Sequence, residues 1–323
     1  MKLATFNREG RQRIGAVLPG LATLVDLASA KDLPAFSSML ALIESGAQGL
    51  DAARAIAASP PKSAVIALSD VTLLAPVPVP MQIRDCLVSE KLFRQARTQN
   101  LRLRSKSAPD PEAAFRKGIE EGLCEPPPVW FEQPIYFKAN RFNVIGTETD
   151  IEWPTYCKLF DYELEMGMFI GRTGRDIGRA AAKDHIFGYT IFNDMTARDA
   201  MSKEVAAGLG PAKGKDFDTG NVIGPWIVTA DEIPDPYDLK MTVRINGAFR
   251  SDGSLAEMHH KFEDMIVHIS RCETLHAGEM IGSGTIGDGS GQEHNIYLEP
   301  GDIIEFEVEK IGTLRNRVVK KWK

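Results

Sequence analysis

Short runs of apolar residues with the periodicity of β-strands dominate the chain from about residue 135 onward. Some runs alternate apolar and polar side chains and others are apolar throughout, as expected for strands with one or both faces buried. The predicted strands cover residues 136–142, 162–170, 186–192, 222–229, 241–245 and 303–308. Asn246-Gly247, a strong hairpin signal, directly follows one of them. Because helical patterns are few here, we predict an α+β fold with a mainly β domain built on a mixed sheet.

The first 75 residues have a different pattern. Short strands are predicted around residues 3–6 and 14–18, and helices around residues 36–43 and 50–57. Three alternate prolines then follow at positions 76, 78 and 80, where they favour a stiff, extended connector. We therefore predict a small N-terminal α/β domain, residues 1–75, and a larger domain, residues 81–323.

Residues 87–104 have helical periodicity and carry a row of basic side chains, which is typical of a solvated helix face. The next segment, residues 105–128, is polar and ends in three consecutive prolines. We interpret this segment as a surface insertion that could act as a lid.

The segment Asp161-Tyr162-Glu163-Leu164-Glu165 places three carboxylates at alternate positions. In a strand all three would lie on one face, where like charges repel. Either bulk water at a solvated edge strand or a bound cation could offset this repulsion. The buried strand predicted at 186–192 leads to another carboxylate, Asp194, which makes a metal site the sharper hypothesis.

Composition excludes several classes of protein. The 38 basic and 44 acidic residues give a net charge of −6, which offers no electrostatic footprint for nucleic acid or an anionic membrane. The four cysteines are widely spaced without a Cys-x-x-Cys pair, which argues against zinc clips and fits a reducing cytoplasm. No apolar stretch reaches membrane-spanning length, and the N-terminus reads as a strand rather than a signal peptide. We expect a cytoplasmic enzyme with a small-molecule substrate.

Several short segments, in a fixed order, resemble the fumarylacetoacetate hydrolase family. They are residues 161–165 (Asp-Tyr-Glu-Leu-Glu), 193–199 (Asn-Asp-Met-Thr-Ala-Arg-Asp), 213–217 (Lys-Gly-Lys-Asp-Phe), 282–285 (Gly-Ser-Gly-Thr) and 298–302 (Leu-Glu-Pro-Gly-Asp). The resemblance extends from about residue 81 to the C-terminus. It implies that residues 81–323 form a catalytic domain with a rolled sheet, and that the protein forms a homodimer.

The resemblance also implies a divalent metal ion, magnesium in the first place, with manganese or calcium as alternatives. Its ligands would be Glu163, Glu165 and Asp194, whose hard oxygen atoms suit such ions. Members of the family use the metal to chelate a 2-oxo acid or 1,3-diketo acid and to stabilise an enolate as a carbon–carbon bond breaks.

Other positions acquire roles from the same resemblance. Lys215 would supply a second positive charge to the enolate as a catalytic residue. Thr285, in a glycine-flanked turn, would bind the substrate carboxylate, and Arg198 would also contact substrate.

Two departures from the family pattern affect the predicted chemistry. Many members carry a general-base histidine seven residues after the aspartate of an Arg-Asp pair, and here Arg84-Asp85 leads to Leu92. Asp85, Glu90 and Lys91 are the nearby alternatives, of which we single out Asp85 and Glu90 as candidates to activate water.

The second departure is Met201, on the predicted helix after Asp194. Many relatives have a substrate-contacting glutamine at this position. Met201 therefore predicts a less polar substrate pocket.

Three functions follow from these residues. The leading hypothesis is a metal-dependent hydrolase that cleaves a carbon–carbon bond in an acylpyruvate or 1,3-diketo acid. Without the histidine, a lyase or isomerase on the same metal site, such as a 2-oxo acid decarboxylase, hydratase or tautomerase, is the alternative. A non-catalytic metal-holding binding protein is the third.

Overall fold

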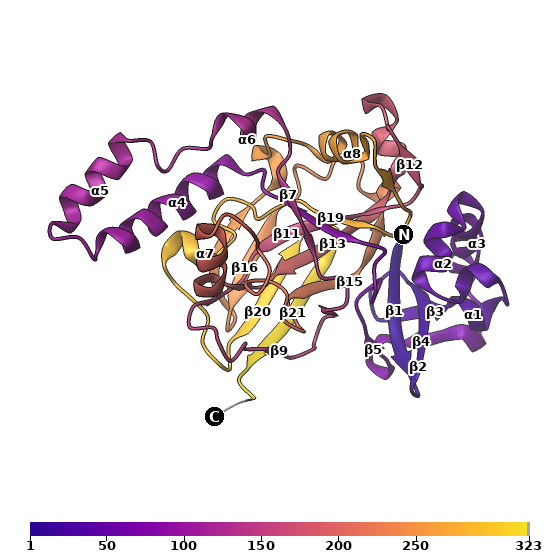
Figure 1. Ribbon diagram of the computed structural model, residues 1–323. Coiled ribbons are helices and arrows are strands. Elements are labelled where there is room, and N and C mark those ends of the chain that lie inside the picture. The colour runs from indigo at the N-terminus through magenta and orange to yellow at the C-terminus, as the bar shows by residue number, and fades with distance from the viewer. Residues whose placement is uncertain (322–323) are drawn as a thin grey trace.

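The computed structural model describes residues 1–321 and is built around one long mixed sheet (Figure 1). The strand order is β4-β3-β2-β1-β15-β13-β11-β19-β6-β7, with β5 paired to β1 and β8 paired to β15. The strands are β1 Lys2–Arg8, β2 Arg11–Val17, β3 Thr23–Asp26, β4 Val65–Ala67, β5 Thr72–Leu73, β6 Ile83–Cys86, β7 Tyr136–Ala139, β8 Val144–Ile145, β11 Leu164–Ile170, β13 Ile186–Asp194, β15 Asn221–Thr229 and β19 Met280–Gly282. Strands β11, β13 and β15 are buried along their whole length, because strands at the middle of a covered sheet need apolar side chains on both faces.

A second sheet packs against the first and has the order β17-β16-β20-β21-β9. Its strands are β9 Ile151–Glu152, β16 Met241–Ile245, β17 Ala248–Gly253, β20 Ile303–Val308 and β21 Gly312–Val319. Asn246 and Gly247 both have positive φ, at 55° and 75°, and connect β16 to β17 as the predicted tight hairpin. Two small antiparallel pairs, β10 Phe160–Asp161 with β14 Thr196–Ala197 and β12 Gly174–Arg175 with β18 Thr274–Leu275, complete the sheets.

The N-terminal strands are continuous with the long sheet, because β1 pairs antiparallel with β15. A buried apolar cluster also spans the junction, and in it Leu3 and Phe36 belong to the same core as Phe187, Ile227 and Met280. Each such fully buried side chain contributes about 1.5–3 kcal/mol to folding. Residues 1–75 therefore share a sheet and a core with the rest of the chain, and the division at the prolines stays a prediction.

The helices lie mostly at the two ends of the molecule. They are α1 Leu27–Ala30, α2 Met39–Glu44, α3 Gly46–Ala58, α4 Glu90–Ser105, α5 Pro111–Glu120, α6 Pro128–Glu132, α7 Arg198–Ala206 and α8 Phe262–Ser270. Figure 1 shows α1, α2 and α3 on the N-terminal strands, while α4 and α5 form an arm that projects from the opposite side of the body. The segment predicted as a polar insertion thus contains a helix, α5, which is capped at its start by Asp110 and packs on α4. None of the described helices is both long and apolar enough to cross a membrane.

The strand predictions are confirmed, with one instructive difference. The acidic stretch does not lie on one continuous strand, because Asp161 ends β10 whereas β11 begins only at Leu164. Glu163 lies between them and forms an isolated bridge with Ser290. The expectation that Asp161, Glu163 and Glu165 share one face of a single strand is therefore wrong. The prediction of a solvated edge is wrong as well, since all three side chains are buried.

Candidate metal centre

Three carboxylates from separate strands meet at one end of the long sheet. Asp85 lies in β6, Glu165 in β11 and Asp194 at the end of β13, and one oxygen from each lies within 4.8 Å of the other two. Strand β19 lies between β6 and β11, and its Gly282 pairs with both Asp85 and Gly167. A Cβ at position 282 would lie 2.4 Å from Asp85 Oδ1 and 2.9 Å from Glu165 Oε2, so only glycine lets these carboxylates approach.

The acidic triad of Asp85, Glu165 and Asp194 is buried and short of positive charge. Burial raises the pKa of Asp85 to about 6. Burial, followed by the neighbouring carboxyl of Asp85, raises the pKa of Glu165 well above its usual value. Burial also raises the pKa of Asp194 well above normal, although the ammonium of Lys215 acts in the opposite direction. Within the described chain, Lys215 is the one cation that forms an ion pair with a member of the triad.

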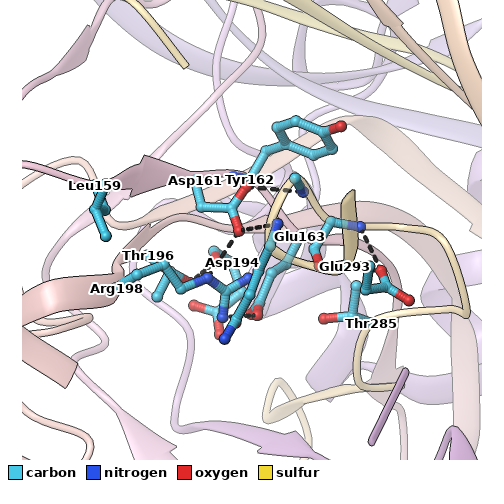
Figure 2. Close-up of polar contacts among 12 residues, drawn as sticks. Leu159, Asp161, Tyr162, Glu163, Asp194, Thr196, Arg198, Thr285 and Glu293 are labelled. Atoms are coloured by element: carbon cyan, nitrogen blue, oxygen red, sulfur yellow. Dashed lines mark hydrogen bonds and ion pairs between the residues drawn. The ribbon is translucent and has the colours of Figure 1, made fainter. Parts of the chain in front are cut away.

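The other two carboxylates of the acidic stretch are neutralised by cationic side chains (Figure 2). Arg198 donates from Nε to Asp161 Oδ2 at 2.7 Å, and its Nη1 forms an ion pair with Glu163 Oε1 at 2.7 Å. Lys215 Nζ lies 2.6 Å from Glu163 Oε2. Burial works against the charged form of Glu163, but Arg198 and Lys215 outweigh it and lower the pKa to about 2. Glu163, predicted as a metal ligand, thus lies beside the triad with both oxygens in ion pairs.

Lys215 joins the two groups of carboxylates. Its ammonium contacts Asp194 Oδ2 and donates to Thr196 Oγ1 at 2.6 Å in addition to Glu163. Those carboxylates raise the pKa of Lys215 despite the opposing effect of burial, so the side chain is cationic. The turn before Lys215 is held by Glu204 on α7, whose carboxylate accepts the backbone N–H groups of residues 212–214 at 2.6–3.2 Å.

Met201 lies on the same helix, α7, and packs against that turn. A Cβ at Gly214 would lie 2.5 Å from Met201 Cβ, which shows how closely the helix and the turn approach. The side chain of Met201 is partly exposed and adds an apolar group next to the turn that precedes Lys215.

Thr285 lies against the triad in a turn that requires glycine. Its hydroxyl donates to Glu165 Oε1 at 3.2 Å, and the backbone N–H of Gly284 donates to Glu165 Oε2 at 3.0 Å. Gly284 has φ of +75°, a left-handed conformation that places this N–H against the carboxylate. The predicted carboxylate-binding residue is therefore next to the candidate metal site.

The predicted water-activating residues occupy different environments. Asp85 is in the triad, and its Oδ1 is buried without a hydrogen-bond partner. Glu90 begins α4, is 42% exposed in its side chain and is paired with Arg94 at 2.7 Å. Leu92, where relatives carry a histidine, is buried on the same helix.

One buried carboxylate near the site was missed by the sequence analysis. Glu293 follows the glycine-rich segment and accepts hydrogen bonds from Asp288 N at 2.7 Å and Ser290 N at 2.9 Å. Burial raises the pKa of Glu293 to about 7. The sequence did offer a signal, a carboxylate just after several glycines. A glycine-rich loop can turn so that its backbone N–H groups point at such a carboxylate.

The residues of the triad fit a divalent cation. All of the offered atoms are hard carboxylate oxygens, the atom set that magnesium, manganese and calcium share. Asp85 Oδ1 is an orphaned buried acceptor, and a cation is the partner that such an atom lacks. Asp85, Glu165 and Asp194 would hold the ion, with Glu163 as the further predicted ligand.

Comparisons with known proteins find relatives of this chain in sequence and in fold. Residues 112–319 match the family model described as fumarylacetoacetate (FAA) hydrolase C-terminal. An uncharacterized protein of Staphylococcus haemolyticus is 39% identical over 161 residues, which are 50% of this chain and 52% of that protein. The matched part thus spans about half the length of this relative.

Solved structures match over the whole chain. A fumarylacetoacetate hydrolase from Exiguobacterium antarcticum has a TM-score of 0.75 and 28% identity, covering 99% of this chain and 100% of that one. A maleylpyruvate hydrolase from Sphingobium sp. SYK-6, in complex with manganese(II) and pyruvate, has a TM-score of 0.72 and 25% identity with full coverage of both chains. A probable 2-hydroxyhepta-2,4-diene-1,7-dioate isomerase from Mycobacterium abscessus has the same TM-score, identity and coverage. The match over residues 112–319 and the shared fold establish that this chain belongs to the fumarylacetoacetate hydrolase family.

Proposed function

We propose that the protein is a divalent-metal-dependent hydrolase that splits an acylpyruvate or related 1,3-diketo acid into pyruvate and a carboxylic acid. The observation that carries this proposal is the buried triad of Asp85, Glu165 and Asp194, which lies beside the cationic Lys215. A structural neighbour that holds manganese and pyruvate supports the same choice of cofactor and product. We propose magnesium as the ion, with manganese or calcium as substitutes.

A bound divalent ion would supply Lewis acidity to the oxygens of the 2-oxo acid. Lys215 would add a fixed positive charge next to the developing enolate, where a preorganised cation stabilises the transition state more than the ground state. Thr285 and Arg198 would hold the substrate carboxylate. Met201 would line the pocket for the acyl group.

In the proposed hydrolysis, water adds its oxygen to the acyl carbonyl carbon and gives up a proton. The carbon–carbon bond then breaks, its electron pair leaves as the enolate of pyruvate, and that enolate takes up a proton. Asp85 and Glu90 are the two candidates for the base. Asp85 is buried in the triad, where its free oxygen would face the ion, and this leaves less of its carboxylate available to take up a proton. Glu90 is half-exposed and already paired with Arg94.

A lyase or isomerase is the second candidate, and Leu92 favours it. A buried leucine replaces the usual water-activating histidine, and decarboxylation or tautomerisation needs the enolate but no activated water. The resemblance to an isomerase supports the same alternative. A metal-holding binding protein is the remaining alternative. Lys215 argues against it, because such a protein does not need a charged lysine beside the triad.

The test is to incubate the purified protein with a panel of acylpyruvates and with oxaloacetate, with magnesium and after chelation, and to identify the products by mass. We expect pyruvate plus a carboxylic acid, formed only with the metal. Carbon dioxide or a rearranged product would favour the lyase or isomerase. Turnover that survives complete chelation would contradict the metal-dependent proposal, and metal binding without turnover of any compound would favour the binder. Glu165→Gln serves as the metal-site variant, and Asp26→Asn, a remote buried carboxylate paired with Arg13, serves as its matched control.

A further inference from the structure

Asp161 belongs to the acidic stretch, but its environment does not suit a metal ligand. Its side chain is fully buried and has every acceptor position in use. Oδ1 accepts from the N–H groups of Tyr162 and Gly291, and Oδ2 accepts from Gln292 N and Arg198 Nε, at 2.7–2.9 Å. A carboxylate with both oxygens saturated by donors has no lone pair left for a cation.

The same bonds fix the orientation of Arg198. Its planar guanidinium is held between Asp161 at Nε and Glu163 at Nη1, so the plane cannot rotate without breaking a charged hydrogen bond. Nη2, the remaining nitrogen, is buried and has no hydrogen-bond partner. Figure 2 shows Arg198 lying between Asp161 and the carboxylates of Glu163 and Asp194.

Asp161 also connects Arg198 to the loop that carries the rest of the site. Gly291 and Gln292, which donate to Asp161, lie in the loop that begins at Thr285. Ser290 of this loop bridges to Glu163, and Gly289 accepts the N–H of Leu164. One buried carboxylate thus links the loop, the start of α7 and the entry to β11.

We propose that Asp161 is a positioning residue, which orients Arg198 so that its free Nη2 receives an anionic oxygen of the substrate and which fastens the loop after Thr285 beside Glu163. An unpartnered guanidinium nitrogen in a buried site is completed by an acceptor, and a carboxylate oxygen is the acceptor that the proposed 2-oxo acid substrate brings. This inference rests on the proposed function for the identity of the anion, but the orientation of Arg198 is independent of it.

The test compares Asp161→Asn with the wild-type protein by two measurements. The Nε–H resonance of Arg198 in NMR spectra reports whether the guanidinium remains fixed, and titration calorimetry with Mn²⁺, then with pyruvate in the presence of Mn²⁺, reports the two affinities separately. We expect the slowly exchanging Nε–H signal to be lost, and pyruvate affinity to fall about tenfold or more, since one charged hydrogen bond is disordered. Mn²⁺ affinity should stay within about twofold, because Asp161 is not a ligand.

Two further variants keep the result interpretable if Asp161→Asn is poorly folded. Arg198→Lys keeps a positive charge but cannot bind two carboxylates in one plane, so it should lose pyruvate affinity while the amides of Gly291 and Gln292 stay protected from hydrogen exchange. Asp26→Asn removes a buried, Arg-paired carboxylate elsewhere and should leave both affinities unchanged.

Unchanged pyruvate affinity in Asp161→Asn, or loss of Mn²⁺ affinity by the same factor, would overturn the positioning role. A wild-type protein that binds Mn²⁺ but no pyruvate would count against the proposed function instead. In that case the Nε–H signal decides the inference alone, and its persistence in Asp161→Asn would refute it.

Discussion

Two groups of buried carboxylates lie side by side in this protein and are stabilised in different ways. Asp161 and Glu163 are paired with Arg198 and Lys215, and the pKa of Glu163 is lowered to about 2. The triad of Asp85, Glu165 and Asp194 forms an ion pair with one cation, Lys215, which also pairs with Glu163. The pKa of each carboxyl group in the triad is raised. Proximity in the sequence therefore does not define the metal site. What marks it is the shortage of positive charge, because a buried carboxylate without a counter-ion is costly until a cation arrives.

The largest expected effect is that two neighbouring substitutions change the free energy of unfolding of the metal-free protein in opposite directions. Glu163→Gln leaves Arg198 and Lys215 undercompensated and should lower the free energy of unfolding by about 3–5 kcal/mol. Glu165→Gln removes a carboxyl that, because of its raised pKa, must take up a proton when the protein folds at neutral pH, so it should raise the free energy of unfolding by about 1 kcal/mol, or Tm by roughly 2 °C. Thermal and urea unfolding after chelation provide the measurement.

Metal binding by the same variants sharpens the comparison. Glu165→Gln should weaken Mn²⁺ binding by about 100-fold, since a charged ligand is lost. An equal loss in Glu163→Gln would show that Glu163 leaves its ion pairs to bind the ion, as the sequence predicts. Stabilities that fall equally in both variants would contradict the division into two groups.

The pH dependence of metal binding is the next effect in size. The carboxyls of the triad have raised pKa values in metal-free protein, with Asp85 at about 6, so they hold protons that a metal must displace. Mn²⁺ affinity should therefore increase by about tenfold per pH unit for each proton released between pH 5 and 7. Calorimetry in buffers of different ionisation enthalpy counts those protons, and pH-independent affinity would contradict the raised values.

The stability of the metal-free protein should show the opposite trend, in a pH window that overlaps this one. Because the folded state binds these protons more tightly than the unfolded state, the contribution of Asp85 to stability decreases as pH rises from about 4 to 6, and the raised pKa values of Glu165 and Asp194 add to the same trend. Glu163, with its lowered pKa, contributes stability above about pH 4 and loses it as pH falls toward 2.

The smallest expected effect concerns Lys215, which the two groups share. Glu204→Gln weakens the capping of residues 212–214 and should loosen the turn that positions Lys215. We expect a loss of about 1 kcal/mol of stability and faster hydrogen exchange in residues 212–216, with Mn²⁺ affinity unchanged. Unaltered exchange in that segment would show that the turn is held by other contacts.

Much of the fold could be predicted from local pattern. The strands around residues 186–192 and 222–229 are apolar throughout because both faces of the sheet are covered, and that requirement is visible in the sequence. The hairpin at Asn246-Gly247 was predictable for a similar reason, since positive φ at two successive residues selects for these side chains. The break between Asp161 and Leu164 was not, because alternation continues across it while the hydrogen-bond partner changes from β14 to β13.

The sequence by itself determined the family, the main strands and the supply of carboxylates and cations for a site. Those features depend on residue type and on spacing over a few positions of the chain. Only the tertiary structure decided which charges meet. Asp85 and Glu165 are 80 positions apart and come together through Gly282, and Arg198 and Lys215 reach Glu163 rather than the solvent. Charge pairing depends on distances in space, so the same five acidic residues divide into an ion-paired group and a candidate metal site only once the sheet has formed.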